Sequence, residues 1–122
     1  MEIKEFWNDI VKQYRSALPS YFCKEAIIRW HCTNEQFTLD EYVQANCDYP
    51  GKWEGKIERL EESSSLVILV GKVQSEDGLI SCHVTSFIKL QDGKVIEMDE
   101  YWADDDEAPG WRKELGIGRK IQ

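Results

Sequence analysis

The stretch "CHVTSFIKLQDGKVIEMDEYWADD", residues 82–105, decides the fold, because two runs of alternating residues flank a short turn. Apolar and polar side chains alternate on both sides of the "QDG" at 91–93. Two such runs joined by a few turn residues are typical of an antiparallel hairpin. We therefore predict strands at 79–90 and 94–103.

The preceding residues extend this hairpin into a larger sheet. Two further strand-like runs, 53–61 and 66–74, are separated by the three serines at 63–65. The pattern predicts a meander of four consecutive antiparallel strands. An earlier run, "KEAIIRWHC" at 24–32, is rich in β-branched and aromatic residues and predicts one more strand.

Two helices are predicted in the first half of the chain. Apolar residues recur at helical spacing over 3–18, and Pro19 stops or restarts this helix. Thr38 is followed three residues later by Glu41, which is the signature of a capping box at the start of a second helix. With 122 residues the chain is too short for two ordinary domains. We predict one α+β domain, residues 1–122, with the helices on one face of the sheet.

The strand at 79–90 also predicts a partner for the other face, because both of its alternating sets are largely apolar. One set is Ile80, Cys82, Val84, Ile88 and Leu90, and the other is Leu79, His83, Thr85 and Phe87. A face exposed to water would be more polar, so we predict that the outer face packs against a second subunit as a homodimer. The alternative is a monomer in which a loop covers this face.

Composition limits the partners of this chain. A net charge of −8 repels phosphate backbones, so we expect no nucleic-acid partner. No apolar run reaches the roughly 20 residues that cross a bilayer, and no signal-peptide pattern is present, so we predict a cytoplasmic protein without a membrane partner. The four cysteines lack C-x-x-C spacing, and nucleotide-binding motifs are absent. We therefore predict neither a metal site nor a cofactor.

Residues 27–55, "IIRWHCTNEQFTLDEYVQANCDYPGKWEG", taken with residues 82–105, resemble the SnoaL-like branch of the nuclear transport factor 2-like superfamily. The resemblance implies a cone-shaped, cystatin-like α+β barrel. In this fold a curved mixed sheet, mostly antiparallel, wraps around N-terminal helices and leaves a cavity, and dimers commonly form across the outer face. The superfamily includes isomerases, dehydratases, epoxide hydrolases, polyketide cyclases and non-enzymatic binders, so the resemblance does not identify a reaction.

The resemblance also implies an acid that faces the cavity from the last strand, and Glu100 is the matching residue. Alternation puts Glu100 on the same side as Met98 and Trp102. A carboxylate in apolar surroundings has a raised pKa and can exchange protons near neutral pH. Two alternatives remain open: a structural ion pair across the sheet, and Asp99 as the inward acid if the register is opposite.

Other candidates complete a hypothetical site. His83 on the neighbouring strand could act as acid or base in the same cavity, or it could be structural. Tyr14, on the helical stripe, could point its hydroxyl into the cavity. The predicted ligand-binding residues are Trp30, Tyr49, Trp53, Met98 and Trp102. The four acids at 104–107 follow the last strand and are predicted to form a solvated loop.

These features together predict a small-molecule pocket protein of the SnoaL-like class. Its ligand would be a small, partly apolar metabolite, and any isomerase, lyase or cyclase activity would proceed by cofactor-free proton transfer. The alternative is a ligand-binding or dimerisation module without turnover.

Overall fold

The computed structural model describes residues 1–121. Within them are three α-helices, α1 (Ile3–Val11), α2 (Leu39–Cys47) and α3 (Gly110–Glu114), and two 3₁₀ turns, η1 (Leu18–Tyr21) and η2 (His31–Thr33). The six strands are β1 (Phe22–Trp30), β2 (Glu35–Thr38), β3 (Trp53–Glu62), β4 (Leu66–Ser75), β5 (Ser81–Gln91) and β6 (Lys94–Asp104).

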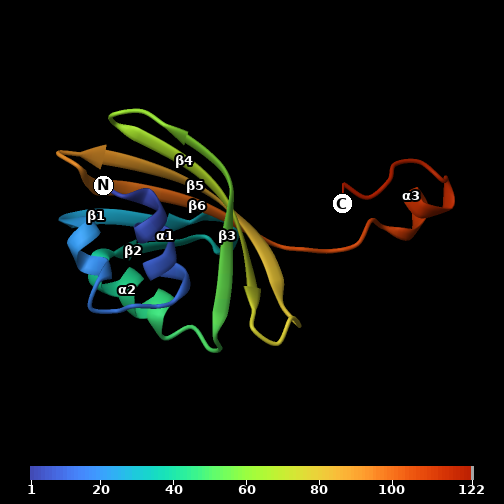
Figure 1. Ribbon diagram of the computed structural model, residues 1–122, viewed down its shortest axis with the longest axis horizontal. Coiled ribbons are helices and arrows are strands. Elements are labelled where there is room, and N and C mark those ends of the chain that lie inside the picture. Colours follow the sequence, from blue (N-terminus) through green and yellow to red (C-terminus); the bar gives the residue numbers. More distant parts are fainter. Residues whose placement is uncertain (122) are drawn as a thin grey trace.

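The strands form one curved sheet in the order β2-β1-β6-β5-β4-β3. Neighbouring strands are antiparallel except β1 and β6, which run parallel. The sheet curls around α1 and α2, which lie against its concave side (Figure 1). The predicted α+β architecture and the four-stranded meander are confirmed. The parallel pair is the feature that places Trp30 directly opposite Glu100.

Helix α1 lies close to the sheet because two strand positions are glycines. A Cβ atom at Gly71 would lie 2.3 Å from the indole of Trp7, and one at Gly55 would lie 2.6 Å from Val11. Only glycine leaves room for this approach. The apolar stripe of α1 is buried against the sheet as a result.

The predicted helix over 3–18 is too long: α1 ends at Val11. Gln13 adopts the left-handed conformation with φ of 59°, which interrupts the helix before η1, in which Pro19 is the second residue. The side-chain amide of Gln13 donates hydrogen bonds to the carbonyl oxygens of Asn46 at 2.9 Å and Tyr49 at 2.8 Å. These bonds tie the end of α1 to the end of α2.

The predicted start of α2 is confirmed by its capping box. The Glu41 amide donates to the Thr38 hydroxyl at 3.3 Å, and the Thr38 amide donates to the Glu41 carboxylate at 2.9 Å. Both bonds satisfy amides that the first helical turn would otherwise leave without a partner.

The outer, convex face of the sheet carries ion pairs and aromatic rings. Arg29 pairs with Glu97 and with Asp99, the latter at 3.3 Å. The Tyr101 ring stacks on His31 at 4.4 Å and meets Phe87 edge-on at 6.1 Å. No helix in residues 1–121 has the length and apolar character needed to span a membrane.

Candidate ligand pocket and buried carboxylate

Glu100 is a buried acid on the concave side of β6. Its exposed fraction is 3%, whereas its neighbour Asp99 lies on the outer face and pairs with Arg29. Three donors converge on the Glu100 carboxylate. Ser86 on β5 donates its hydroxyl to Oε2. The indole nitrogens of Trp30 and Trp102 donate to Oε1, at 3.1 and 3.4 Å.

The electrostatics around Glu100 are those of an acid without a counterion. In the described part of the chain no Lys, Arg or His forms an ion pair with it. Burial raises the pKa of Glu100 above its ordinary value of 4.5, against the opposing effect of its hydrogen bonds from Ser86, Trp102 and Trp30. Because a carboxylate with a raised pKa binds its proton more readily, Glu100 has the property expected of a proton-exchanging group.

Tyr42 shows how little polar compensation surrounds this acid. The residue lies on α2 and is fully buried, and its hydroxyl has no hydrogen-bond partner among the described residues. Burial, together with the charge of Glu100, raises the pKa of Tyr42 well above its ordinary value. Sequence reasoning missed both Tyr42 and Ser86. For Ser86 the sequence contained a signal, since this residue shares the alternating set of Val84 and Ile88 and therefore faces the same side of the sheet.

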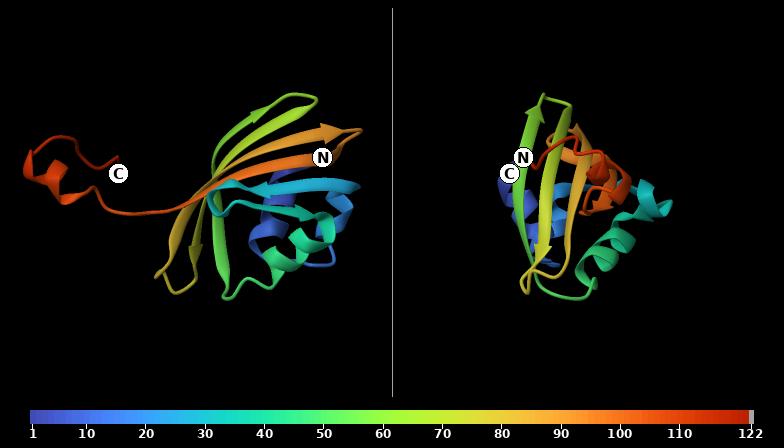
Figure 2. Two further views of the ribbon diagram at one scale, coloured as in Figure 1. Left: turned by 180° about the vertical axis from the view of Figure 1, so that it is seen from behind. Right: turned by 90° about the vertical axis from the view of Figure 1, so that its right-hand side faces the viewer.

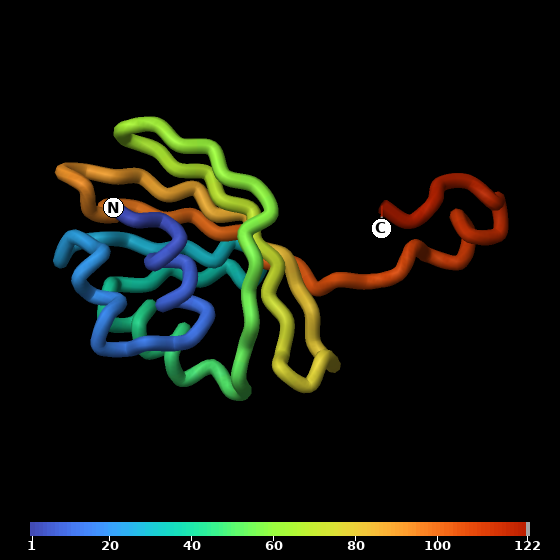
Figure 3. Tube along the Cα trace, in the orientation of Figure 1, coloured from blue at the N-terminus to red at the C-terminus, as the bar shows by residue number. Residues whose placement is uncertain are grey.

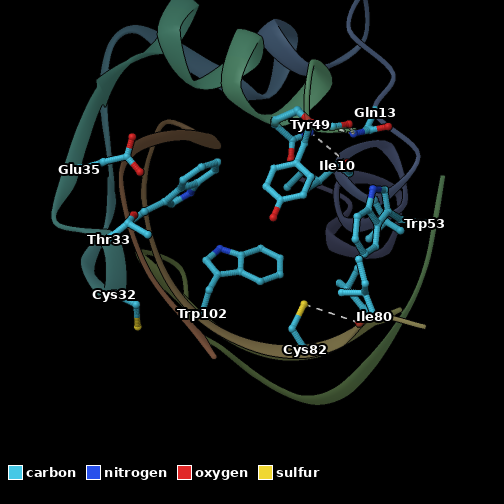
Figure 4. A pocket seen from close by; sticks show the side chains of 14 residues that line it. Ile10, Gln13, Cys32, Thr33, Glu35, Tyr49, Trp53, Ile80, Cys82 and Trp102 are labelled. Carbon is cyan, nitrogen blue, oxygen red and sulfur yellow. Dashed lines mark hydrogen bonds between the residues drawn. The ribbon is translucent and has the colours of Figure 1, made fainter. Parts of the chain in front are cut away.

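A cavity of about 280 Å³ opens beside this group of residues, between the ends of α1 and α2 and the concave face of the sheet (Figure 4). Its wall is mostly apolar and aromatic, with Tyr49, Trp53 and Trp102 around the central space. The lining residues are Ile10, Val11, Gln13, Trp30, Cys32, Thr33, Glu35, Asn46, Tyr49, Trp53, Val73, Ile80, Cys82 and Trp102. This wall includes one acid, Glu35, and lacks Lys, Arg and His.

Glu100 and the cavity meet through two indoles. Trp30 and Trp102 line the cavity, and both donate their N–H groups to the carboxylate. Glu100 itself does not line the cavity. The acid therefore lies behind the aromatic wall and fixes the orientation of both rings.

The structure brings most of the predicted ligand-binding residues together. Trp30, Tyr49, Trp53 and Trp102 all line the cavity, whereas Met98 is fully buried and does not reach it. Sequence reasoning missed the polar lining residues, among them the helix-terminal residue Asn46. The roles assigned to these residues in ligand binding stay predictions.

The expected positions of His83 and Tyr14 at the cavity are wrong. His83 lies on the outer face of β5, where its ring hydrogen-bonds Asp105 and pairs with Glu58 at 2.9 Å. The alternation of β5 explains this, since it is the neighbouring Cys82 that lines the cavity. Tyr14 follows the end of α1 and is 52% exposed. Neither side chain converges on Glu100.

The described residues do not form a metal site. Among residues 1–121 no group of three or more His, Cys, Asp and Glu side chains is arranged to hold a metal ion. The four cysteines are free, and Cys32 is exposed.

Comparison with known proteins identifies relatives by structure alone. No protein-family model and no curated protein sequence matches the chain. A candidate ketosteroid isomerase from Kribbella flavida superposes with a TM-score of 0.81 at 18% identity, covering 98% of this chain and 87% of that one. An NTF2-like protein of unknown function from Burkholderia xenovorans gives a TM-score of 0.78 at 20% identity, covering 98% and 92%.

A third crystal structure is a candidate SnoaL-like polyketide cyclase from a Jannaschia species. Its TM-score is 0.70 at 14% identity, and the match covers 82% of this chain and 81% of that one. At these identities the likeness establishes the fold and leaves the chemistry to be argued from the residues.

Proposed function

From the nuclear transport factor 2-like fold of this chain, we propose that it is a small-molecule pocket protein of the SnoaL-like class. Its ligand is a small, partly apolar metabolite that occupies the cavity beside Trp30 and Trp102. Glu100 exchanges a proton with that ligand without a cofactor, in an isomerase, lyase or cyclase reaction. The four free cysteines fit a reducing compartment such as the cytoplasm.

The observation that carries this proposal is the buried carboxylate behind the cavity wall. A carboxylate without a counterion is costly to bury, and a chain that served only stability would do better with an apolar side chain there. Pairing a raised pKa with an adjacent apolar cavity is the usual arrangement of an acid–base site.

The charge of the cavity restricts its ligand. An anionic ligand would meet no cationic side chain in the wall and would lie near Glu35 and Glu100. Uncharged and cationic ligands avoid this repulsion, and a cation gains further from the aromatic rings. We therefore place carboxylates and phosphates outside the ligand class.

Proton exchange requires that Glu100 become accessible from the cavity. The hydrogen bond from Trp102 is the weaker of the two indole bonds, because its length of 3.4 Å exceeds the usual range, and this ring is partly exposed. Rotation of Trp102 would open the carboxylate to a bound ligand while Trp30 and Ser86 continued to hold it.

The alternative is ligand binding without turnover. One observation favours it: the two indoles stand between Glu100 and the cavity, so the acid would serve only to orient the aromatic wall. In this alternative the protein binds the same class of ligand but catalyses no reaction.

The second part of the proposal is a homodimer through the outer face of the sheet. Phe87 and Tyr101 are both exposed on this face. Partly exposed Ile68 and Val70 lie beside them across the strands. Contiguous apolar surface of this kind is typical of an interface between subunits.

A matched pair of probes tests the ligand class. Cyclohexanone and cyclohexanecarboxylate have similar rings and differ in charge. We expect cyclohexanone to bind at least tenfold more tightly than the carboxylate at pH 8, measured by ligand-observed NMR. Equal binding, or tighter binding of the carboxylate, would contradict the proposed pocket chemistry.

Glu100→Gln separates the two readings of the acid. Once a fragment screen has identified a ligand that is turned over, this variant should retain binding and lose turnover. Retained turnover would remove Glu100 from the reaction, and a screen without turnover would favour the binding module.

A further inference from the structure

The end of the chain forms an arm that leaves the body of the protein. After β6, residues 105–121 extend away from the sheet and carry α3 (Figures 2 and 3). None of these residues is buried. The arm nevertheless presents large apolar side chains, with exposed fractions of 60% for Trp111, 63% for Leu115 and 60% for Ile117.

Such an arm is unstable in isolation. Helix α3 has five residues, and helices much shorter than about 12 residues do not persist in water without packing against something else. Its apolar side chains have no contact with the body that would bury them. A surface that covers these side chains would have to come from another molecule.

The root of the arm is fixed so that the arm points outward. The Asp105 amide donates to the Ser81 carbonyl at 2.9 Å, which continues the pairing of β5 and β6 past the end of β6. The Asp105 carboxylate accepts a hydrogen bond from the Ser81 hydroxyl and forms another with His83. These three bonds give His83 a structural role, and they make Asp105 part of an anchor rather than the predicted solvated loop.

The arm also belongs to the part of the fold that two relatives share. The likeness to the Kribbella and Burkholderia proteins covers 98% of this chain, which leaves about two of its 122 residues outside the match. The arm of residues 105–121 is far longer than that. The span matched in these two relatives therefore includes residues of the arm.

A suitable acceptor lies on the outer face of the sheet. We call it the outer patch, and it consists of Ile68, Val70, Phe87 and Tyr101. All four are partly or largely exposed. The patch adjoins the root of the arm, since Tyr101 is on the strand from which the arm departs.

Charge favours a second copy as the occupant of this patch. Residues 110–121 contain four Lys or Arg and one Glu, a net charge of +3, while the rest of the chain has 11 Lys or Arg and 22 Asp or Glu, a net charge of −11. A basic arm is thus attracted to the acidic body of another copy. Because each chain has both an arm and a patch, mutual exchange closes into a two-fold dimer.

We propose that the arm of each chain packs across the outer patch of a second copy, which returns its own arm in the same way. The exchange covers Trp111, Leu115 and Ile117, and in the outer-face dimer it is the partner's arm, rather than the partner's sheet, that lies on the outer patch. Interfaces that bury about 800 Å² on each partner are typically stable, and an exchanged arm contributes to that area.

Sedimentation of the full-length protein tests this exchange. Replacing two apolar arm residues, Trp111→Ser with Leu115→Ser, should raise the dimer dissociation constant at least tenfold. Gly110→Ser, an exposed position on the same helix whose replacement leaves the charge of the arm unchanged, is the matched control and should leave the constant unchanged. Far-ultraviolet circular dichroism spectra should be the same for all variants, because these side chains are exposed within one chain.

Two sedimentation results would overturn the exchange. One is a wild-type protein that stays a 14.3 kDa monomer at 100 µM, which would also remove the outer-face dimer. The other is a dimer whose dissociation constant is the same with and without the two serines, which would leave the outer-face dimer standing without its arms.

Cross-linking locates the arm directly. In a Cys32→Ser background, one chain carries Trp111→Cys and a second, size-tagged chain carries Phe87→Cys. Oxidation of the mixture should link the two chains. Asn8→Cys, exposed on α1 at the opposite face of the sheet, is the control acceptor and should give no linked product. Equal linkage to Asn8→Cys and Phe87→Cys would contradict the placement on the outer patch.

Discussion

The indole nitrogen of Trp30 lies 3.1 Å from Oε1 of Glu100 and donates a hydrogen bond to it. The two residues are 70 positions apart in the chain and meet because β1 and β6 pair in parallel with Trp30 opposite Glu100. Glu100 is a buried acid, and Trp30 is part of the wall of the cavity.

Removing the Trp30 donor should destabilise the protein more than removing the Trp102 donor. Trp30→Phe leaves Oε1 with only the longer bond from Trp102, and Trp30 also packs edge-on against Phe37 at 4.8 Å. Taking a hydrogen-bond partner from a buried polar group costs about 1–3 kcal/mol, and we expect a loss in that range for Trp30→Phe. Trp102→Phe should cost less. Urea unfolding measures both, and a larger loss for Trp102→Phe would contradict this order.

Glu100→Gln should make the protein relatively more stable as pH rises. Burial raises the folded-state pKa of Glu100 above the unfolded value near 4.5. The stability that the protonated acid contributes is therefore complete below the unfolded pKa and is lost as pH rises through the folded pKa. Glutamine cannot ionise and escapes this loss.

The measurement is the difference in unfolding free energy between Glu100→Gln and wild type from pH 4 to pH 8. It should change in favour of the variant as pH increases. Ser86→Ala is a useful companion variant. It removes a donor to the charged form of Glu100, so it should lose more stability than the wild type as pH rises. A difference that stays constant with pH would show that Glu100 has the same pKa in both states.

Gly71→Ala should be strongly destabilising. The added methyl group would lie 2.3 Å from the Trp7 ring, and overpacking of this kind costs about 1–3 kcal/mol. Gly110→Ala is the matched control, because nothing lies within 4 Å of its added methyl group. Thermal unfolding compares the two. Equal melting temperatures would contradict the close packing of α1 on the sheet.

The anchor between His83 and Asp105 should stabilise the fold in a limited pH window. Hydrogen bonding to Asp105 raises the pKa of His83 above 6.5, so its contribution is complete below that value and is lost as pH rises through the folded pKa. Burial tends to raise the pKa of Asp105, but its hydrogen bonds to Ser81 and His83 lower it below 3.8. This contribution is present above 3.8 and is lost in more acidic solution.

Asp105→Asn should therefore cost most between about pH 4 and pH 6.5, within the roughly 0.2–1 kcal/mol typical of exposed ion pairs. Chemical unfolding at pH 5.5 and at pH 9 measures the change in this cost. A cost that is larger at pH 9 would contradict the assignment of His83 as the charged partner.

Local pattern predicted much of the fold. The alternation of β5 and β6 and the capping residues Thr38 and Glu41 are signals between neighbours in sequence, and the elements they predict are present. The end of α1 was missed, because the apolar stripe continues past Val11 and does not reveal the left-handed turn at Gln13.

The site depends on contacts that sequence periodicity does not encode. Alternation grouped Glu100 with Trp102. The contact between Glu100 and Trp30, however, depends on the register of the parallel pair β1 and β6, which are far apart in the sequence. For β5 both alternating sets are apolar, so the pattern could not decide on which face His83 lies. The aromatic wall was easier to predict, since Tyr49 and Trp53 flank the turn that borders the cavity.

The most direct test of the central claim is the titration of Glu100 itself. Carbon-13 NMR of glutamate carboxyl groups, with Glu100→Gln to assign the resonance, measures its protonation midpoint in the folded protein. We predict a midpoint above 4.5, as expected when burial outweighs the three hydrogen bonds. A midpoint at or below 4.5 would show an ordinary carboxylate held by its donors, and would contradict the role of Glu100 as a proton-exchanging group.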